Sequence, residues 1–193
     1  MGLRLITGPT VEPLTLADMR VQCRLEPGDT DNDAMLTVAI AAARAKAESV
    51  TRSAVMPQTW DLTLDAFPSN EIKLARPPVT QIVSVKYLDA DGATQTLDSS
   101  KYVLDDATFP GWVLPTYGNA WPSTRAVGNA VAVRMTCGYA NAAAVPGDLR
   151  LWLLMTAAFI FEHREIMVVD GKVGELPNNF AQHLLDTYTV FEF

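Results

Sequence analysis

Residues that carry catalysis or hold metals are scarce in this chain. It contains two cysteines and two histidines among 193 residues. Cys23 and Cys137 lie far apart and lack the paired C-x-x-C spacing of a zinc or redox site, so free thiols in a reducing cytosol are expected. His163 and His183 fall in separate predicted helices, where a solvated or helix-capping role is favoured over a metal site. The composition predicts no enzyme, no metal and no cofactor.

Positive charge is also scarce. The chain has 15 Lys and Arg residues against 22 Asp and Glu residues, a formal net charge of −7 and a pI near 4.7. A protein that grips nucleic acid neutralises phosphates with a surface crowded with Lys and Arg. The acidic balance therefore disfavours a DNA-gripping role.

No apolar run is long enough to cross a membrane. The densest run, Leu151–Phe161, would span about 16 Å as a helix, against about 30 Å for the core of a bilayer. The stretch Met1–Pro9 carries one charge and too short an apolar run for a signal peptide. We expect a buried helix over Leu151–Phe161, no membrane partner and no secretion by the general route.

Two short motifs imitate ligand-binding loops without completing them. Asp29–Asp33 opens like a calcium loop, but Ala34 and Ile40 stand where that loop needs Gly and a bidentate Glu. Gly171-Lys172 resembles the end of a phosphate-binding loop, yet Val173 replaces the required hydroxyl residue. We expect the Asp-rich segment to complement the dipole of a helix N-terminus.

Helical patterns occupy both ends of the sequence. Thr15 followed by Asp18 predicts a capping box that opens a helix over residues 16–25. The segment from 31 to 55 places an apolar stripe at 3.6-residue spacing, consisting of Leu36, Ile40, Ala43, Ala47 and Val50. Residues 146–163 predict a third helix, apolar on nearly every side, which is typical of a bundle centre or of a face shared between subunits.

The middle of the chain alternates like a sheet. Residues 59–65 alternate strictly between apolar and polar side chains, and Asp91-Gly92 predicts a hairpin turn with positive φ at both positions. Further strands are predicted over residues 72–74, 82–88, 94–97, 102–104, 112–114 and 131–137. The pattern predicts an α+β fold: a small helical bundle, formed by residues 1–56 and 140–193, with an antiparallel β-rich insertion over 57–139.

The C-terminus presents exposed aromatic residues. A last predicted helix is followed by Phe191-Glu192-Phe193, and such aromatics either pack on the parent domain or dock on a partner. Arg164 and Glu165 end the third helix as a charged cluster. This cluster either fixes subunit register or forms a solvated helix end.

These segments, in this order, resemble the head-to-tail connector, or adaptor, proteins of long-tailed bacteriophages, prophages and gene transfer particles. The resemblance runs nearly end to end. It is carried by residues 5–7 leading to 13–17, by the start of the second helix with Ala41–Arg44, by Gln58–Pro68, Leu74–Val79, Val83–Asp89, Trp121-Pro122, Gly138-Tyr139 and Glu175–Pro177.

The resemblance implies a structural virion protein, assembled in the cytoplasm of a bacterial host. It would form a ring of twelve copies under the portal, joining the filled head to the next tail component and leaving a channel through which DNA passes without specific binding. We expect the portal to receive the C-terminal segment through Phe180, Tyr188, Phe191 and Phe193. Trp152, Arg164 and Glu165 are the candidate contacts between subunits.

Two alternatives remain open at this point. The first is a stopper or tail-completion protein of the same particle, which would also form a ring without catalysis. The second is a domain that binds a small ligand in a pocket formed by the loops of Trp112 and Trp121.

Overall fold

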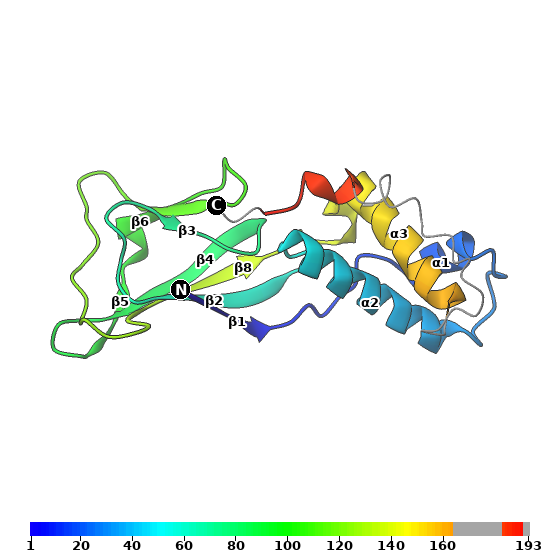
Figure 1. Ribbon diagram of the computed structural model, residues 1–193, viewed down its shortest axis with the longest axis horizontal. Coiled ribbons are helices and arrows are strands. Elements are labelled where there is room, and N and C mark those ends of the chain that lie inside the picture. Colours follow the sequence, from blue (N-terminus) through cyan, green and yellow to red (C-terminus); the bar gives the residue numbers. More distant parts are fainter. Residues whose placement is uncertain (164–182, 191–193) are drawn as a thin grey trace, which may run out of the picture. The chain divides into compact units, whose positions relative to one another are not determined.

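The structure is a computed structural model that describes residues 1–163 and 183–190 (Figure 1). The chain divides into two compact units. One, the β unit, comprises Met1–Thr10 and Met56–Tyr139, and the other, the helical unit, comprises Val11–Val55 and Ala140–Phe193. The predicted α+β class with a β-rich middle is confirmed.

The helical unit contains α1 (Leu16–Gln22), α2 (Asp33–Thr51) and α3 (Gly147–Glu162), with a short 3-10 helix, η2, at Ala142–Ala144. The predicted capping box is present at the start of α1. Because α2 presents alanines on its buried face, its backbone can approach α3 closely. The fully or nearly fully buried side chains of this core are Met19, Leu36, Ala39, Ile40, Ala43, Ala47, Leu149, Leu153 and Ala157.

Two Arg side chains tie the elements of the helical unit together. Arg44 of α2 donates to both carboxylate oxygens of Glu12, at 2.7 and 3.1 Å, and to Glu48 at 3.0 Å. Arg150 of α3 donates to the Asp18 carboxylate at 2.8 Å and so links α3 to the capping box of α1. These partly buried pairs fix how the helices pack, since one Arg satisfies several acceptors at once.

The β unit contains a large and a small antiparallel sheet (Figure 1). The large sheet consists, in spatial order, of β1 (Gly2–Thr7), β2 (Gln58–Leu64), β8 (Val131–Cys137), β4 (Val79–Leu88) and β5 (Thr94–Leu97). The small sheet consists of β3 (Ile72–Lys73), β7 (Trp112–Pro115) and β6 (Tyr102–Asp105), and the 3-10 helix η1 (Ser99–Lys101) precedes β6. The fully buried residues Leu62, Val85, Val113, Val131, Val133 and Met135 form the core of this unit.

Three local features differ from the sequence prediction. Residues 1–56 were assigned to the helical part, but residues 2–7 form β1, which pairs with β2 and joins the large sheet. The helix α2 ends at Thr51, where Arg52 adopts a left-handed conformation, rather than at Pro57. In the hairpin between β4 and β5 only Gly92 has positive φ (87°), because the Asp89 carboxylate accepts the backbone N–H groups of Asp91 and Ala93 and shapes a longer loop.

Gly138 follows β8 at the point where the chain leaves the large sheet. Its φ is 100°, and a Cβ at this position would collide with the carbonyl group of Met56. We expect Gly138→Ala to destabilise the β unit by more than about 2 kcal/mol, because a left-handed residue and a backbone clash coincide. Gly118→Ala is the control, since Gly118 also has positive φ (79°) but a Cβ added there would meet no atom within 4 Å.

Chemical unfolding of both variants measures this difference. Gly118→Ala should cost about 1 kcal/mol, from the left-handed conformation alone. Equal losses in the two variants would show that Gly138 does not need its close approach to Met56.

Candidate functional site

The described part of the C-terminal segment, residues 183–190, packs on the helical unit of its own chain. His183–Asp186 forms a helical turn, and the side chain of Leu185 is only 3% exposed. Two hydrogen bonds hold the segment to the end of α2. The N–H of Val190 donates to the carbonyl of Thr51 at 2.9 Å, and the Ser53 hydroxyl donates to the carbonyl of Tyr188 at 2.6 Å.

The location of these bonds follows from helix geometry. The last carbonyls of a helix have no partner within it. Thr51 is the last residue of α2 and is buried, so its carbonyl needs a hydrogen-bond donor from outside the helix, and the N–H of Val190 donates to it. The segment therefore completes the C-terminal end of α2.

Tyr188 adds a side-chain bond to the same attachment. Its hydroxyl donates to Oδ1 of Asp148 in the first turn of α3, at 2.7 Å, and this oxygen also accepts the N–H of Leu149 at 2.9 Å. Residues 183–190 thus bridge the end of α2 and the start of α3. We call this arrangement the C-terminal anchor.

The predicted docking and interface residues divide into two sets. Tyr188 lies in the C-terminal anchor, and Trp152 is 8% exposed within the helical unit, so both contact their own chain. Phe180, Phe191, Phe193, Arg164 and Glu165 lie outside the described residues. Their assignment to the portal or to a neighbouring subunit stays a prediction.

A second surface was not predicted from the sequence. The five strands of the large sheet contain four charged residues, Arg4, Asp61, Lys86 and Arg134, and the strand register places all four on one face. Arg4 of β1 and Arg134 of β8 both lie opposite Asp61 of β2. Ser84 of β4 lies opposite Arg134, and Lys86, two residues after Ser84, shares its face. We call this surface the polar sheet face. Alternation within each strand indicates which of its residues share a face. The sequence does not reveal the register that brings the faces of neighbouring strands together.

The centre of the polar sheet face is a two-pronged ion pair. Arg134 donates from Nε and Nη2 to the two oxygens of Asp61, at 2.7 and 2.8 Å, and Nη2 of Arg4 lies 3.8 Å from the same carboxylate. The hydrogen bonds from Arg134 hold the pKa of Asp61 below its ordinary value. Asp61 is 9% exposed, whereas the Arg4 side chain is 76% exposed and Lys86 is also exposed.

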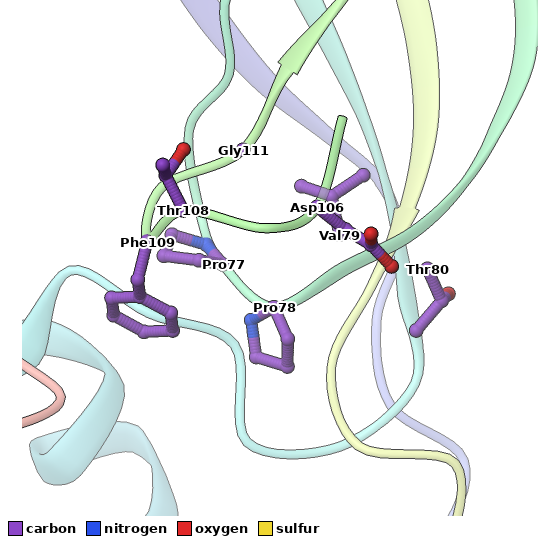
Figure 2. Close-up of a pocket in the computed structure, with 8 residues that line it drawn as sticks. All are labelled: Pro77, Pro78, Val79, Thr80, Asp106, Thr108, Phe109 and Gly111. Carbon is purple, nitrogen blue, oxygen red and sulfur yellow. The ribbon is translucent and has the colours of Figure 1, made fainter. Parts of the chain in front are cut away.

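The β unit also contains a cavity of about 290 Å³, lined by residues at the start of β4 and in the loop between β6 and β7 (Figure 2). Asp106 is its one charged lining residue, and Thr80 and Thr108 bring hydroxyl groups. Such a lining offers no paired acid and base. The lining residues are Pro77, Pro78, Val79, Thr80, Asp106, Thr108, Phe109 and Gly111.

The loop between β6 and β7, which leads into Trp112, lines this cavity, but Trp112 and Trp121 themselves do not. Trp121 stacks on Phe67 with ring centroids 4.9 Å apart, and its Nε1 donates to the carbonyl of Asn70 at 2.6 Å. Trp121 therefore fastens its loop to the β unit. Residues 1–163 and 183–190 contain no group of three or more metal-binding side chains and no helix of the length and apolarity that a membrane crossing requires.

Among the comparisons with known proteins, only the one with solved structures finds a match. No family model and no curated protein matches the chain. The chain is similar to a chain in the neck of an empty gene transfer agent particle, computed with C6 symmetry. That match has 25% identity and a TM-score of 0.78, and it covers 100% of this chain and 97% of the other.

Two further structures show the same fold over the same shares of both chains. They are the virion of a native gene transfer agent particle, at 23% identity and a TM-score of 0.79, and the neck of a native particle computed with C12 symmetry, at 22% and 0.68. The likeness covers the whole chain, including both units.

The hydrogen bond from Tyr188 to Asp148 in the C-terminal anchor can be tested by substitution. We expect Tyr188→Phe to loosen residues 183–190, since the Asp148 oxygen loses a hydrogen bond of about 1–3 kcal/mol. Amide hydrogen exchange should then accelerate at Val190, whose N–H is bonded to Thr51. Tyr117→Phe is the control, because Tyr117 is fully exposed. Unchanged exchange at Val190 would show that the backbone bonds suffice.

The ion pair of the polar sheet face predicts a response to acid. A carboxyl whose pKa is lowered by folding stabilises the fold above its unfolded pKa, and this contribution is lost as pH falls through the folded pKa. We expect the stability difference between the wild type and Asp61→Asn to be largest above pH 4 and to shrink below the ordinary Asp value of 3.8. Urea unfolding between pH 7 and pH 2 measures it. A difference that does not vary with pH would contradict the assignment.

Proposed function

We propose that this protein is a structural subunit of the neck of a gene transfer agent or phage-like particle, located in the virion. The observation that carries the proposal is the likeness to a neck chain at 25% identity, which covers 100% of this chain and 97% of that one. A match over both units is harder to obtain by chance than a match of one common domain.

A ring is the oligomer that best fits this role. Two of the similar structures are necks computed with C6 and C12 symmetry. Copies related by such rotation meet through heterologous contacts, in which each copy presents two different faces to its neighbours. We propose a ring of twelve copies, consistent with the resemblance to connector proteins.

Within the neck we propose the connector position, between the portal and the next tail component. The C-terminal anchor supports this proposal, because it holds residues 183–190 on the helical unit and the aromatic residue Phe191 follows them in the sequence. Aromatic side chains that follow a segment already held in place are suited to docking in an apolar pocket, because less chain has to be ordered upon binding.

The stopper remains the second candidate function. It shares the ring form, and the same neck structures support it equally. The two roles differ in the partner that the ring contacts: the portal for a connector, and the tail side for a stopper. An enzymatic role is not favoured, because Asp106 is the single charged side chain among the residues that line the cavity, which leaves no paired acid and base there.

Electron microscopy of the purified chain mixed with its portal protein tests the connector role. We expect rings seated on the portal for the wild type and loss of these rings when Phe191 and Phe193 are both changed to Ala. The control is Phe109→Ala, which removes an exposed aromatic of the β unit. Rings that form but ignore the portal and bind the tail component would favour the stopper. A chain absent from purified necks would overturn the neck assignment itself.

A further inference from the structure

Charge is divided unevenly between the two units. The β unit has eight carboxylate residues against seven Lys and Arg residues, whereas the helical unit has fourteen against eight. The net charge of −7 therefore belongs almost wholly to the helical unit. Three of the seven cations of the β unit lie together on the polar sheet face.

The polar sheet face carries more positive than negative charge. It carries three cations, Arg4, Lys86 and Arg134, and a single carboxylate, Asp61. Asp61 is occupied by Arg134, so the face presents a net charge of about +2. Around these charges lie side chains that can donate or accept hydrogen bonds: Thr59, Thr63, Ser84, Thr96 and Thr136. A surface of charges and hydroxyl groups suits a polar protein partner.

The helical unit has an acidic surface where α1 ends and α2 begins. Glu26 and Asp31 are exposed there, and their carboxylates make no hydrogen bond or ion pair with a residue that the structure describes. Nearby, Asp33 is already paired with Arg20, and Asp29 accepts the N–H of Asp31. We call Glu26 and Asp31 together the acidic end of the helical unit.

We propose that the polar sheet face of one copy docks on the acidic end of the helical unit of a second copy. The two surfaces are different and opposite in charge, so the contact is heterologous and repeats around a ring. This inference rests on the ring in the proposed function and names the surfaces that form it. Lys86 and Arg4 meet Glu26 and Asp31, while the Asp61–Arg134 pair holds the sheet face in register.

A nucleic acid is a weaker match to the same face. Two net positive charges neutralise about two phosphates, which gives a salt slope of only about −1.8 per copy. The acidic end of a second copy provides instead a matching number of fixed carboxylates at a defined place. Charge-paired contacts between copies also weaken with salt, because exposed pairs are screened over about 10 Å at 0.1 M.

Zero-length carbodiimide crosslinking tests which groups meet. An equal mixture of ¹⁴N- and ¹⁵N-labelled full-length chain, at high concentration and low salt, is crosslinked, digested and analysed by mass spectrometry. We expect Lys86 to join Glu26 or Asp31 in peptides of mixed label, which identifies a bond between copies. Peptides of a single label only, or no link at Lys86 in a chain that associates, would overturn the proposal. So would a wild-type chain that stays monomeric under these conditions.

Charge reversal then tests whether the contact drives association. We expect Lys86→Glu to weaken self-association at least tenfold in sedimentation velocity, and Asp31→Lys to weaken it similarly. The two variants mixed together, or combined in one chain, should regain association. Lys101→Glu is the control, because Lys101 is an exposed lysine of the same unit that lies on η1 and not on a strand of the large sheet. Loss of association with Lys101→Glu to the same extent would indicate a general charge effect and overturn the proposal.

These outcomes are separable from the neck assignment. A wild-type chain found in purified necks, together with Lys86→Glu that assembles normally, would leave the function standing and reject the contact. Weakened binding of duplex DNA by Lys86→Glu, without any change in self-association, would assign the face to nucleic acid instead. A chain that shows the reciprocal charge rescue but is absent from necks would keep the contact and reject the function.

Discussion

The antiparallel pairing of β2 with β8 is the contact on which the β unit depends. It joins Gln58, the first residue of β2, to Cys137, the last residue of β8, and continues without a shift to Leu64 and Val131. The side chains of a strand alternate between two faces, so a slip of one residue would exchange the buried and solvated faces. This register buries Leu62 against Val133 and brings Asp61 beside Arg134.

The same pairing explains how a sheet can be inserted between α2 and α3. Residues 58–137 begin and end on neighbouring strands, and Gly138 gives the close approach to Met56 that lets the chain leave there. The polar sheet face and the buried core are then two sides of one register. A single set of backbone hydrogen bonds determines both the stability of the unit and the surface that we propose for docking.

Local sequence patterns predicted most of the elements. The capping box of Thr15 and Asp18 has both partners within one turn, and the alternation of residues 59–65 needs no distant contact. The strand β1 was missed because it belongs to the sheet through its pairing with β2, which lies far along the chain, and its residues Leu3 and Leu5 are exposed at 37% and 45%. The C-terminal anchor could not be predicted because Tyr188 and Asp148 lie 40 positions apart, and the polar sheet face required the register of four strands.

Three adjacent strands, β1, β2 and β8, carry the three chain segments that connect the β unit to the helical unit. Thr7, Gln58 and Cys137 stand at the same end of these strands, since Thr7 pairs with Thr59 and Gln58 pairs with Cys137. A tensile load between the units therefore divides among three covalent strands instead of one. Because all three strands are pulled at the same end, such a load draws them in the same direction. It therefore has little tendency to slide one strand past another and shear their hydrogen bonds.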